Sequence, residues 1–486
     1  MKSSFMKKLL ATALVAIMAV SMLAGCGKSS GKVVRVMRAC FNLGNIDEAQ
    51  EKKVVDAINA YLKDKGRDYT ITLADIPSGE YTEKANLAIA NKEIDLLWTA
   101  SWEDVIGTNQ LFTNQAAYDI SDLVVGTDLY KSMAVGQWEA GKYDGKIFYV
   151  PVYKDNVEGY DLMVRKALVD KYNFDLSSVK KLADIEPMLK VIKEEEGLKY
   201  PLLTQKTAMF FRYYINDFDF FTQKSLVAVD RTSNSVVNVI ATPQYAEFCK
   251  LMAKWAELGY VSEDDVTKTT TDTTTQTQDW GFSWWTDIPV NDEANSRYKQ
   301  DVVMTPITDR WAHSTSALGS CYAIMKSCDE ATAKNAIDFL GLLYTDSKLA
   351  DIYTFGIEGE DFTYDANHQV SQKADAKYNH SMWESASATV VTPLDNEPAN
   401  KASLYDAFNG GAKTSCAAGF RYDKTPVEAE YTACESIWEE YGFVLENGGY
   451  KEAEVDAKIA EYIDKLNAAG YQKVLDEFTK QYNAWK

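Results

Sequence analysis

The fold is decided by residues 69–98, YTITLADIPSGEYTEKANLAIANKEIDLLW. The alternating residues Tyr69–Leu73 predict a strand. The helical spacing of apolar residues from Tyr81 to Asn91 predicts a helix, and the apolar run Ile94–Trp98 predicts the next strand. A strand, a helix and a strand in this order are typical of an α/β protein, in which helices cover both faces of a sheet.

The same alternation continues on both sides of this stretch. Upstream, the β-branched residues Val33–Met37 predict a strand, and Asp47 caps an amphipathic helix that reaches Leu62. Downstream, the turn-rich residues 141–146 lead to a strand at Tyr160–Val164, which begins a second α/β unit. Further helices are predicted at Arg165–Tyr172, Leu182–Glu195, Tyr245–Leu258, Ala331–Tyr344, Val427–Glu440 and Tyr450–Trp485.

The N-terminus carries a targeting signal. A basic start precedes an uncharged, mostly apolar run over residues 9–24. The end of this run, Leu23-Ala24-Gly25-Cys26, resembles a bacterial lipobox, in which the cysteine is lipidated and becomes the new N-terminus. The resemblance implies a signal peptide over residues 1–25, a lipid on Cys26 and a polar tether over residues 26–32. An ordinary secretory signal and a retained anchor are the alternatives.

The composition fits a large globular body. Of the 486 residues, 46% are hydrophobic and 25% are charged, which is ordinary for globular proteins. The net charge of −20 argues against nucleic acid and anionic lipid headgroups as partners. Seven cysteines are present; those other than Cys26 contain no Cys-x-x-Cys motif, so the sequence favours free, buried thiols over disulfides.

A polar, low-complexity segment lies next to the densest aromatic patch. Threonine occupies eight of the eleven positions from Thr267 to Thr277, which predicts a mobile loop because such segments bury little apolar surface. The patch Trp280–Trp285 follows directly. Since neighbouring residues of a strand face opposite ways, Trp284 and Trp285 cannot share one pocket.

The sequence contains no catalytic or cofactor motif. Its three histidines, His313, His368 and His380, lack metal-ligand spacing. A nucleophile elbow, a Walker loop and a dinucleotide fingerprint are also absent. We therefore predict no enzyme, no cofactor and no metal site. A glycoside-acting enzyme stays open as a minor alternative, since such enzymes need two carboxyl groups facing across one bond, and so does an adhesion or structural role.

Several stretches, in order, resemble the extracellular solute-binding proteins of ATP-driven importers, specifically the maltose-binding-like group for oligosaccharides. They are residues 58–62 (INAYL), 88–97 (AIANKEIDLL), 144–151 (DGKIFYVP), 161–168 (DLMVRKAL), and 280–283 (WGFS) with 305–307 (TPI). Residues 355–360 (FGIEGE), 419–423 (GFRYD) and 481–485 (QYNAW) resemble a narrower lipoprotein branch that has a C-terminal domain of unknown function.

This resemblance implies a type II, two-lobed periplasmic-binding-protein-like fold with a hinge, a central ligand cleft and extra C-terminal helices. The first lobe would comprise residues 33–152 and 306–355. The second would comprise residues 153–305 and 356–486. The chain would cross between the lobes near residues 153–156, 305–308 and 354–358.

The resemblance also implies a substrate-binding lipoprotein of an ABC transporter, a monomer anchored to the outer face of the bacterial cell membrane. It would capture an oligosaccharide and deliver it to the transmembrane subunits of a permease. A peptide or another small solute is the alternative ligand.

A sugar site needs aromatic rings for the apolar C–H faces and planar polar groups for the hydroxyls. The expected ligand-binding residues are Glu80, Trp98, Trp102, Lys154, Asp155, Asn156, Trp280, Trp284 and Trp285. Each has a structural alternative: a tryptophan near a strand end can be core, Asp155 and Asn156 can stabilise a hinge, and Glu80 can favour a helix start. Of the two adjacent tryptophans, Trp284 is slightly favoured for the cleft.

Overall fold

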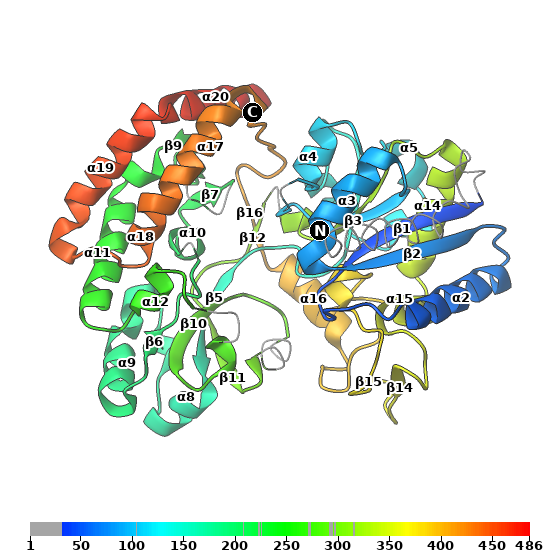
Figure 1. Ribbon diagram of the computed structural model, residues 1–486, viewed down its shortest axis with the longest axis horizontal. Helices are drawn as coiled ribbons and strands as arrows, with labels where there is room; N and C mark the ends of the chain where they lie inside the picture. The colour runs from blue at the N-terminus through cyan, green and yellow to red at the C-terminus, as the bar shows by residue number, and fades with distance from the viewer. Residues whose placement is uncertain are drawn as a thin grey trace, which may run out of the picture.

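The protein consists of two bodies, lobe 1 and lobe 2, joined by three crossings of the chain (Figure 1). The structure is a computed structural model, and it describes residues 32–486 except 104, 208, 222–223, 225, 271–273, 291–294, 296–297 and 314–315. The predicted signal peptide and the predicted lipidation site Cys26 lie outside the described residues. None of the described helices is both long and apolar enough to cross a membrane.

Lobe 1 is built on a five-stranded sheet in the order β2-β1-β3-β13-β4. The strands are β1 (Val33–Cys40), β2 (Thr70–Pro77), β3 (Leu96–Thr99), β4 (Tyr149–Pro151) and β13 (Cys321–Ile324). The first three are parallel to one another, and β13 runs against both of its neighbours. The strands predicted at residues 33–37, 69–73 and 94–98 are therefore confirmed, each within a few residues.

Helices cover both faces of this sheet, as the alternation predicts. In α2 (Glu48–Asp64), the Asp47 side chain accepts a hydrogen bond from the amide of Gln50, while Val54, Ile58 and Leu62 are fully buried along one face. This is the capped, amphipathic helix expected from the sequence. The other helices of lobe 1 are α3 (Ser78–Asn91), α4 (Thr108–Thr113), α5 (Ser121–Val124), α6 (Asp128–Lys131), α7 (Val135–Ala140), α14 (Glu330–Leu343), α15 (Ser347–Phe355) and α16 (Lys401–Gly410).

Lobe 2 is built on a four-stranded sheet in the order β11-β5-β10-β6. Its strands are β5 (Tyr160–Arg165), β6 (Tyr200–Leu202), β10 (Trp280–Thr286) and β11 (Val302–Pro306). Side chains alternate across β5, so that Tyr160, Leu162 and Val164 enter the main core of the lobe, whereas Met163 enters a smaller core on the opposite face. A second, small sheet pairs β7 (Phe218–Phe220), β8 (Ala228–Asp230) and β9 (Ser235–Val237).

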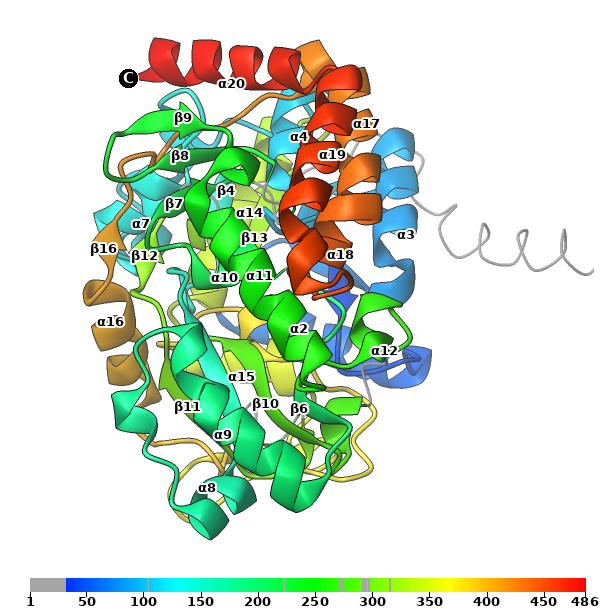
Figure 2. The same ribbon diagram turned by 90° about the vertical axis from the view of Figure 1, so that its left-hand side faces the viewer.

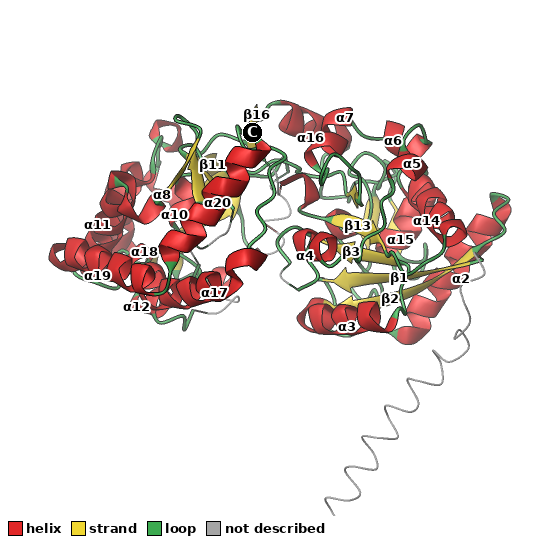
Figure 3. Ribbon diagram, turned by 90° about the horizontal axis from the view of Figure 1, so that it is seen from above, coloured by secondary structure: helices red, strands yellow, loops and turns green. Residues whose placement is uncertain are grey.

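The C-terminal helices pack on lobe 2 and complete its main core. They are α17 (Glu428–Ile437), α18 (Phe443–Glu446), α19 (Val455–Ala468) and α20 (Tyr471–Trp485). Helices α18 and α19 lie beside α11 (Pro243–Glu257), and α17 and α20 pack on α19 (Figures 2 and 3). The shorter helices of the lobe are α8 (Lys166–Tyr172), α9 (Glu186–Val191), α10 (Phe210–Tyr213) and α12 (Glu263–Val266). The prediction that these C-terminal helices belong to the second lobe is confirmed.

The three crossings are hydrogen-bonded to one another. Glu158, on the first crossing, exchanges two backbone hydrogen bonds with Trp311 on the second, at 2.9 and 2.8 Å. The short strand β12 (Trp311–Ala312) pairs with β16 (Lys413–Thr414) on the third crossing. The Asn409 side chain, just before that crossing, donates to the carbonyl of Lys154 at 2.7 Å and accepts from the amide of Asn156 at 2.9 Å. The crossings therefore form one connected hinge.

The predicted position of the third crossing, near residues 354–358, is wrong. Residues 356–405 stay with lobe 1, because Phe362, Tyr378, Met382 and Tyr405 all pack into the lobe 1 core. This segment contains the hairpin of β14 (Phe362–Tyr364) and β15 (Val370–Gln372). The chain returns to lobe 2 only after α16, where Ala417 and Phe420 enter the lobe 2 core. The assignment of the whole range 356–486 to lobe 2 is corrected accordingly.

The threonine-rich segment is not simply an exposed loop. Thr270 and Thr275 are buried; the hydroxyl of Thr270 donates to Asp265, and the carbonyl of Thr275 accepts from the Trp280 indole. Hydrogen bonding of threonine hydroxyls and carbonyls anchors these residues in the absence of apolar side chains. Among the described cysteines, all six are free thiols, and all but Cys416 are buried, which agrees with the preference for free thiols.

Candidate functional site

The two sheets present their corresponding edges to the hinge. In lobe 1, the parallel strands β1, β2 and β3 end, and β13 begins, at the edge where the chain leaves for the first crossing. In lobe 2, β6 and β10 end, and β5 begins, at the edge next to the crossings. Figure 3 shows β1 and β2 pointing toward lobe 2. Ligands of open α/β sheets bind outside such carboxyl edges, so we searched both edges for binding groups.

The lobe 1 edge carries four aromatic rings, here called the lobe 1 aromatic cluster: Phe41, Trp98, Trp102 and Trp383. Phe41 follows β1, and its ring centroid lies 4.8 Å from that of Trp383 and 6.2 Å from that of Trp102. Trp98 is fully buried beneath them, with its ring centroid 5.9 Å from that of Trp102. Phe41 is 38% exposed and Trp102 is 47% exposed, so the cluster presents apolar ring surface to solvent.

Hydrogen bonds to the two residues before β13 fix Trp98 and Trp102. The Trp98 indole donates to the Ser320 hydroxyl at 2.8 Å, and the Trp102 indole donates to the carbonyl of Gly319 at 2.7 Å. Both indole nitrogens are therefore satisfied by the protein, which leaves the ring faces as the surface that a ligand can use.

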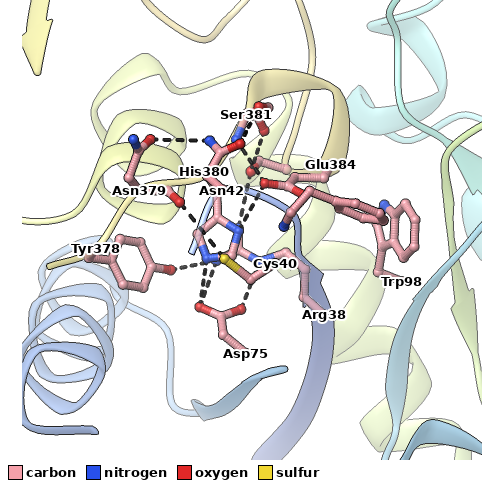
Figure 4. Close-up of polar contacts among 12 residues, drawn as sticks. Arg38, Cys40, Asn42, Asp75, Trp98, Tyr378, Asn379, His380, Ser381 and Glu384 are labelled. Carbon is pink, nitrogen blue, oxygen red and sulfur yellow. Dashed lines mark hydrogen bonds and ion pairs between the residues drawn. The ribbon is translucent and has the colours of Figure 1, made fainter. Parts of the chain in front are cut away.

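A buried ionic network lies behind the cluster (Figure 4). Arg38 donates two hydrogen bonds to Asp75, at 2.9 and 3.0 Å. His380 Nε2 lies 2.9 Å from the same carboxylate, and Nδ1 lies 3.2 Å from Oε1 of Glu384. Glu384 in turn accepts a hydrogen bond from the amide of Phe41 at 3.2 Å. Charged groups on β1, β2 and residues 380–384 thus hold Phe41 and its neighbour Trp383 in place.

The network keeps its members charged. Burial would raise the pKa of Asp75, but Arg38 and His380 outweigh it and hold that pKa well below its usual range. Burial and Arg38 would lower the pKa of His380, yet the charge and the hydrogen bond of Asp75 raise it well above 6.5. The pair is therefore an imidazolium and a carboxylate at neutral pH.

Amide and hydroxyl side chains follow Phe41 and precede Trp383 of the lobe 1 aromatic cluster. The amide groups of Asn42 and Asn379 face each other at 3.4 Å, and the Ser381 hydroxyl donates to Asn42 at 3.2 Å (Figure 4). Asn42 is exposed, and Asn379 and Ser381 are half-buried. Amide and hydroxyl groups both donate and accept, which suits them to ligand hydroxyls.

The lobe 2 edge presents a tryptophan stacked on an arginine. The guanidinium carbon of Arg212, on α10, lies 3.7 Å from the ring centroid of Trp284. The Trp284 indole donates to the carbonyl of Thr204 at 3.0 Å, and the ring is half-buried against the main core. Burial lowers the pKa of Arg212 from its ordinary high value. We call this pair the Arg212–Trp284 stack.

The structure separates the sequence-predicted site residues into groups. Trp102 is exposed in the lobe 1 aromatic cluster, and Trp284 lies at the lobe 2 edge. Glu80 is exposed at the start of α3 and forms an ion pair with Lys84. Lys154 pairs with Asp155, at 2.9 Å, on the first crossing. Asn156 is buried there and donates to the carbonyls of Val152 and Ala317, so it stabilises the hinge.

Two of the predicted ligand contacts are core residues instead. Trp98 and Trp280 are both 0% exposed, and Trp280 lies in the smaller core of lobe 2. Trp285 packs against that same core, with its ring centroid 5.2 Å from that of Tyr298. The expectation that Trp284 and Trp285 face opposite ways is confirmed.

Phe41, Trp383 and Arg212 were missed by the sequence analysis. Phe41 directly follows β1, but the strand predicted from the sequence ends at Met37, so the sequence did not place Phe41 at a strand end. Arg212 lies within an aromatic run that also fits a buried helix. Trp383 lies in the segment assigned to the wrong lobe, and nothing in its local sequence indicates its neighbours.

Comparisons with known proteins agree with this two-lobed arrangement. The family described as bacterial extracellular solute-binding protein matches residues 56–417, and a domain of unknown function, DUF3502, matches residues 416–486. A curated relative from Streptococcus pneumoniae serotype 4, described as a carbohydrate ABC transporter substrate-binding protein, is 24% identical over 421 residues, which is 83% of this chain and 82% of the relative.

Two solved structures of the N-glycan transport solute binding protein NgtS from Streptococcus pneumoniae share the fold. One has a TM-score of 0.80 at 21% identity and covers 93% of this chain and 98% of its own. The other, in complex with Man5GlcNAc, has a TM-score of 0.68 at 22% identity, with the same coverage of 93% and 98%.

Proposed function

Because this chain belongs to the family of bacterial extracellular solute-binding proteins, we propose that it is the substrate-binding lipoprotein of an ABC transporter. It captures an oligosaccharide between lobe 1 and lobe 2 and delivers it to the transmembrane subunits of a permease. The observation that carries this proposal is the exposed ring surface of Phe41 and Trp102 at the edge of lobe 1 that faces the hinge.

The chemistry of the facing edges suits a sugar. Pyranose rings have apolar C–H faces, and these pack on aromatic rings such as those of the lobe 1 aromatic cluster. Their hydroxyls are both donors and acceptors, as are the neighbouring groups of Asn42 and Ser381. The names of the carbohydrate-binding relative and of NgtS support the same class of ligand.

Capture requires the lobes to close on the ligand. A ligand that contacts both lobes stabilises the closed form, because only that form makes both sets of contacts.

The location follows from the family and the N-terminus. The family is extracellular, and we propose that a lipid on Cys26 tethers the monomeric protein to the outer face of the cell membrane. The tether concentrates it beside its permease, which no soluble form would achieve. Mass spectrometry of the membrane-extracted protein tests this: the mature chain should begin at a diacylated Cys26, and an unmodified N-terminus elsewhere would overturn it.

Calorimetry against a panel of ligands tests the binding proposal. The panel comprises neutral oligosaccharides that contain mannose and N-acetylglucosamine, fructo-oligosaccharides, alginate oligomers and short peptides. We expect heat and a thermal shift with one of the neutral oligosaccharides, together with a smaller radius of gyration in X-ray scattering. A response to peptides and to none of the sugars would replace the oligosaccharide with a peptide ligand, and an unchanged scattering curve at saturation would overturn closure.

A further inference from the structure

The loop that follows β6 is held by side chains that are distant in sequence. This loop, of which residues 203–207 and 209 are described, leaves the sheet at the edge of lobe 2 that faces the hinge and leads into α10. The amides of Met209 and Phe210 both donate to Oε2 of Glu446, each at 3.0 Å. One carboxylate from the C-terminal region thus binds the two amides at the point where the loop becomes helix.

Asn447 holds the other end of the loop. Its Oδ1 accepts a hydrogen bond from the Thr204 hydroxyl at 2.6 Å, and its Nδ2 donates to the carbonyl of Thr207 at 3.1 Å. Both Glu446 and Asn447 are fully buried. The loop therefore rests on two adjacent residues of the C-terminal region, and neither of them reaches solvent.

The C-terminal helices fix these two residues. The Trp438 indole lies 3.3 Å from Oε1 of Glu446, and the Nδ2 of Asn447 also donates to the carbonyl of Phe443 at 3.0 Å. The next residue, Gly448, has a φ of +76° and packs so tightly on α11 that a Cβ would lie 2.5 Å from the carbonyl oxygen of Met252. This close approach, which only glycine permits, sets the position of the pair.

The same loop determines the position of the Arg212–Trp284 stack. The carbonyl of Thr204 accepts the Trp284 indole at 3.0 Å, and Gln205 donates to the Ser283 hydroxyl at 2.8 Å. Arg212 lies on the short helix whose first amides Glu446 binds. A displacement of the loop would therefore move both partners of the stack.

From this chain of contacts we infer that the C-terminal region, residues 416–486, is a positioning module: Glu446 and Asn447 hold the loop after β6 so that the half-buried ring of Trp284, which rests on the buried Arg212, can contact the bound ligand. The inference assigns a role to a region whose family has no known function. It rests on the proposed function for the nature of the ligand. The positioning itself does not depend on that ligand.

The test uses the full mature protein and three variants of the C-terminal region. Glu446→Ala removes the acceptor of three buried donors, whereas Glu446→Gln keeps a side-chain oxygen for the two amides. Glu461→Ala is the matched control, because Glu461 is also a hydrogen-bond acceptor of the C-terminal region, but its donors are the Tyr441 hydroxyl and the Lys458 ammonium, which both lie outside the loop. Asn447→Ala replaces Glu446→Ala if the latter does not fold.

Hydrogen exchange without ligand is measured first, over peptides that cover residues 203–214. We expect exchange at least about tenfold faster in Glu446→Ala, which corresponds to about 1.4 kcal/mol, near wild-type exchange in Glu446→Gln, and no change in Glu461→Ala. Unchanged exchange in a folded Glu446→Ala, or in Asn447→Ala where it replaces that variant, would overturn the positioning role, whether or not the protein binds sugar.

Calorimetry with the oligosaccharide found for the wild type is the second measurement. We expect binding about tenfold weaker in Glu446→Ala and restored to within about twofold in Glu446→Gln. Faster exchange with unchanged affinity would overturn the link between the loop and the ligand. If the wild-type protein binds no sugar at all, the proposed function fails, and the exchange measurement alone decides the inference.

Discussion

The two edges that face the hinge present aromatic surface in different ways. Lobe 1 exposes Phe41 and Trp102 and supports them with the buried charges of Arg38, Asp75 and His380, which Glu384 connects to Phe41. In lobe 2, Trp284 is half-buried and stacks on Arg212. Its indole donates to the carbonyl of Thr204, and Glu446 of the C-terminal region holds the start of the helix that carries Arg212. Lobe 1 thus offers exposed apolar rings above a buried ionic network, whereas lobe 2 offers one half-buried ring that rests on a buried cation.

Removal of the central cation of the lobe 1 network should have the largest effect. Arg38→Ala leaves Asp75 buried beside His380 without its main partner. Breaking a buried ion pair by removing one partner costs about 3–5 kcal/mol. Chemical denaturation should show this loss, and hydrogen exchange should place it in lobe 1.

A half-exposed pair in the same lobe provides the control. Arg67 pairs with Asp338 at 2.9 Å with about a third of each side chain exposed, so Arg67→Ala should cost no more than about 1 kcal/mol. Equal losses in the two variants would mean that the network behind the aromatic cluster is no more important to lobe 1 than an ordinary surface pair.

The sequence predicted the lobes better than the hinge. Residues 69–98 predict a strand, a helix and a strand, because apolar residues repeat every two positions in a strand and about every 3.6 positions in a helix. Residues 356–405 contain only a short hairpin and irregular segments before α16. These residues belong to lobe 1 because Tyr378 and Met382 pack into its core. Such contacts join segments far apart in the chain, so the local sequence pattern does not predict them.

The sequence predicted those parts of the candidate site that depend on one strand end, and not the contacts between distant segments. The sequence places Trp98 at the end of a predicted strand and Trp102 shortly after it, and both lie on the edge that faces the hinge, but the sequence does not distinguish the buried ring from the exposed one. Trp98 is buried because its strand is central, with β1 on one side and β13 on the other. The contact between Phe41 and Trp383, and that between Arg212 and Trp284, join segments far apart in sequence.

Truncation of the exposed tryptophan should affect binding rather than stability. Trp102→Ala removes the most exposed ring of the lobe 1 aromatic cluster. Central aromatic contacts contribute about 2 kcal/mol, so the dissociation constant for the oligosaccharide should rise about 30-fold. Trp485→Ala is the control, because Trp485 is similarly exposed, at 43%, on α20. If both variants lose affinity equally, or if neither loses affinity, the lobe 1 aromatic cluster is not part of the ligand site.

A buried acid in lobe 2 should respond to pH with the opposite sign from the lobe 1 network. One oxygen of Asp161 lacks a hydrogen-bond partner, and burial, with the nearby Asp287, raises its pKa to about 8 against the opposing effect of Arg310. The folded state therefore keeps a proton that the unfolded state loses near pH 4. Stability falls as pH rises from about 4 to 8.

Asp161→Asn should remove this part of the pH dependence. The variant should match the wild type near pH 4 and become the more stable of the two as pH rises toward 8. Asp75→Asn should instead lose stability above pH 4, because the Asp75 charge is favourable in the folded state. Denaturation midpoints measured across this range would settle the comparison, and parallel curves for the two variants would contradict it.

The smallest effect is expected at Glu80, which lies at the same edge as Trp102 but in a different environment. Its side chain is 62% exposed and pairs with Lys84 one turn along α3, which is 49% exposed. Such i,i+4 pairs add little to a helix. If Glu80 only supports the start of α3, Glu80→Gln should change the dissociation constant for the oligosaccharide less than twofold. A loss approaching that of Trp102→Ala would instead make Glu80 an acceptor of ligand hydroxyls, and lobe 1 would then bind through charge as well as through its rings.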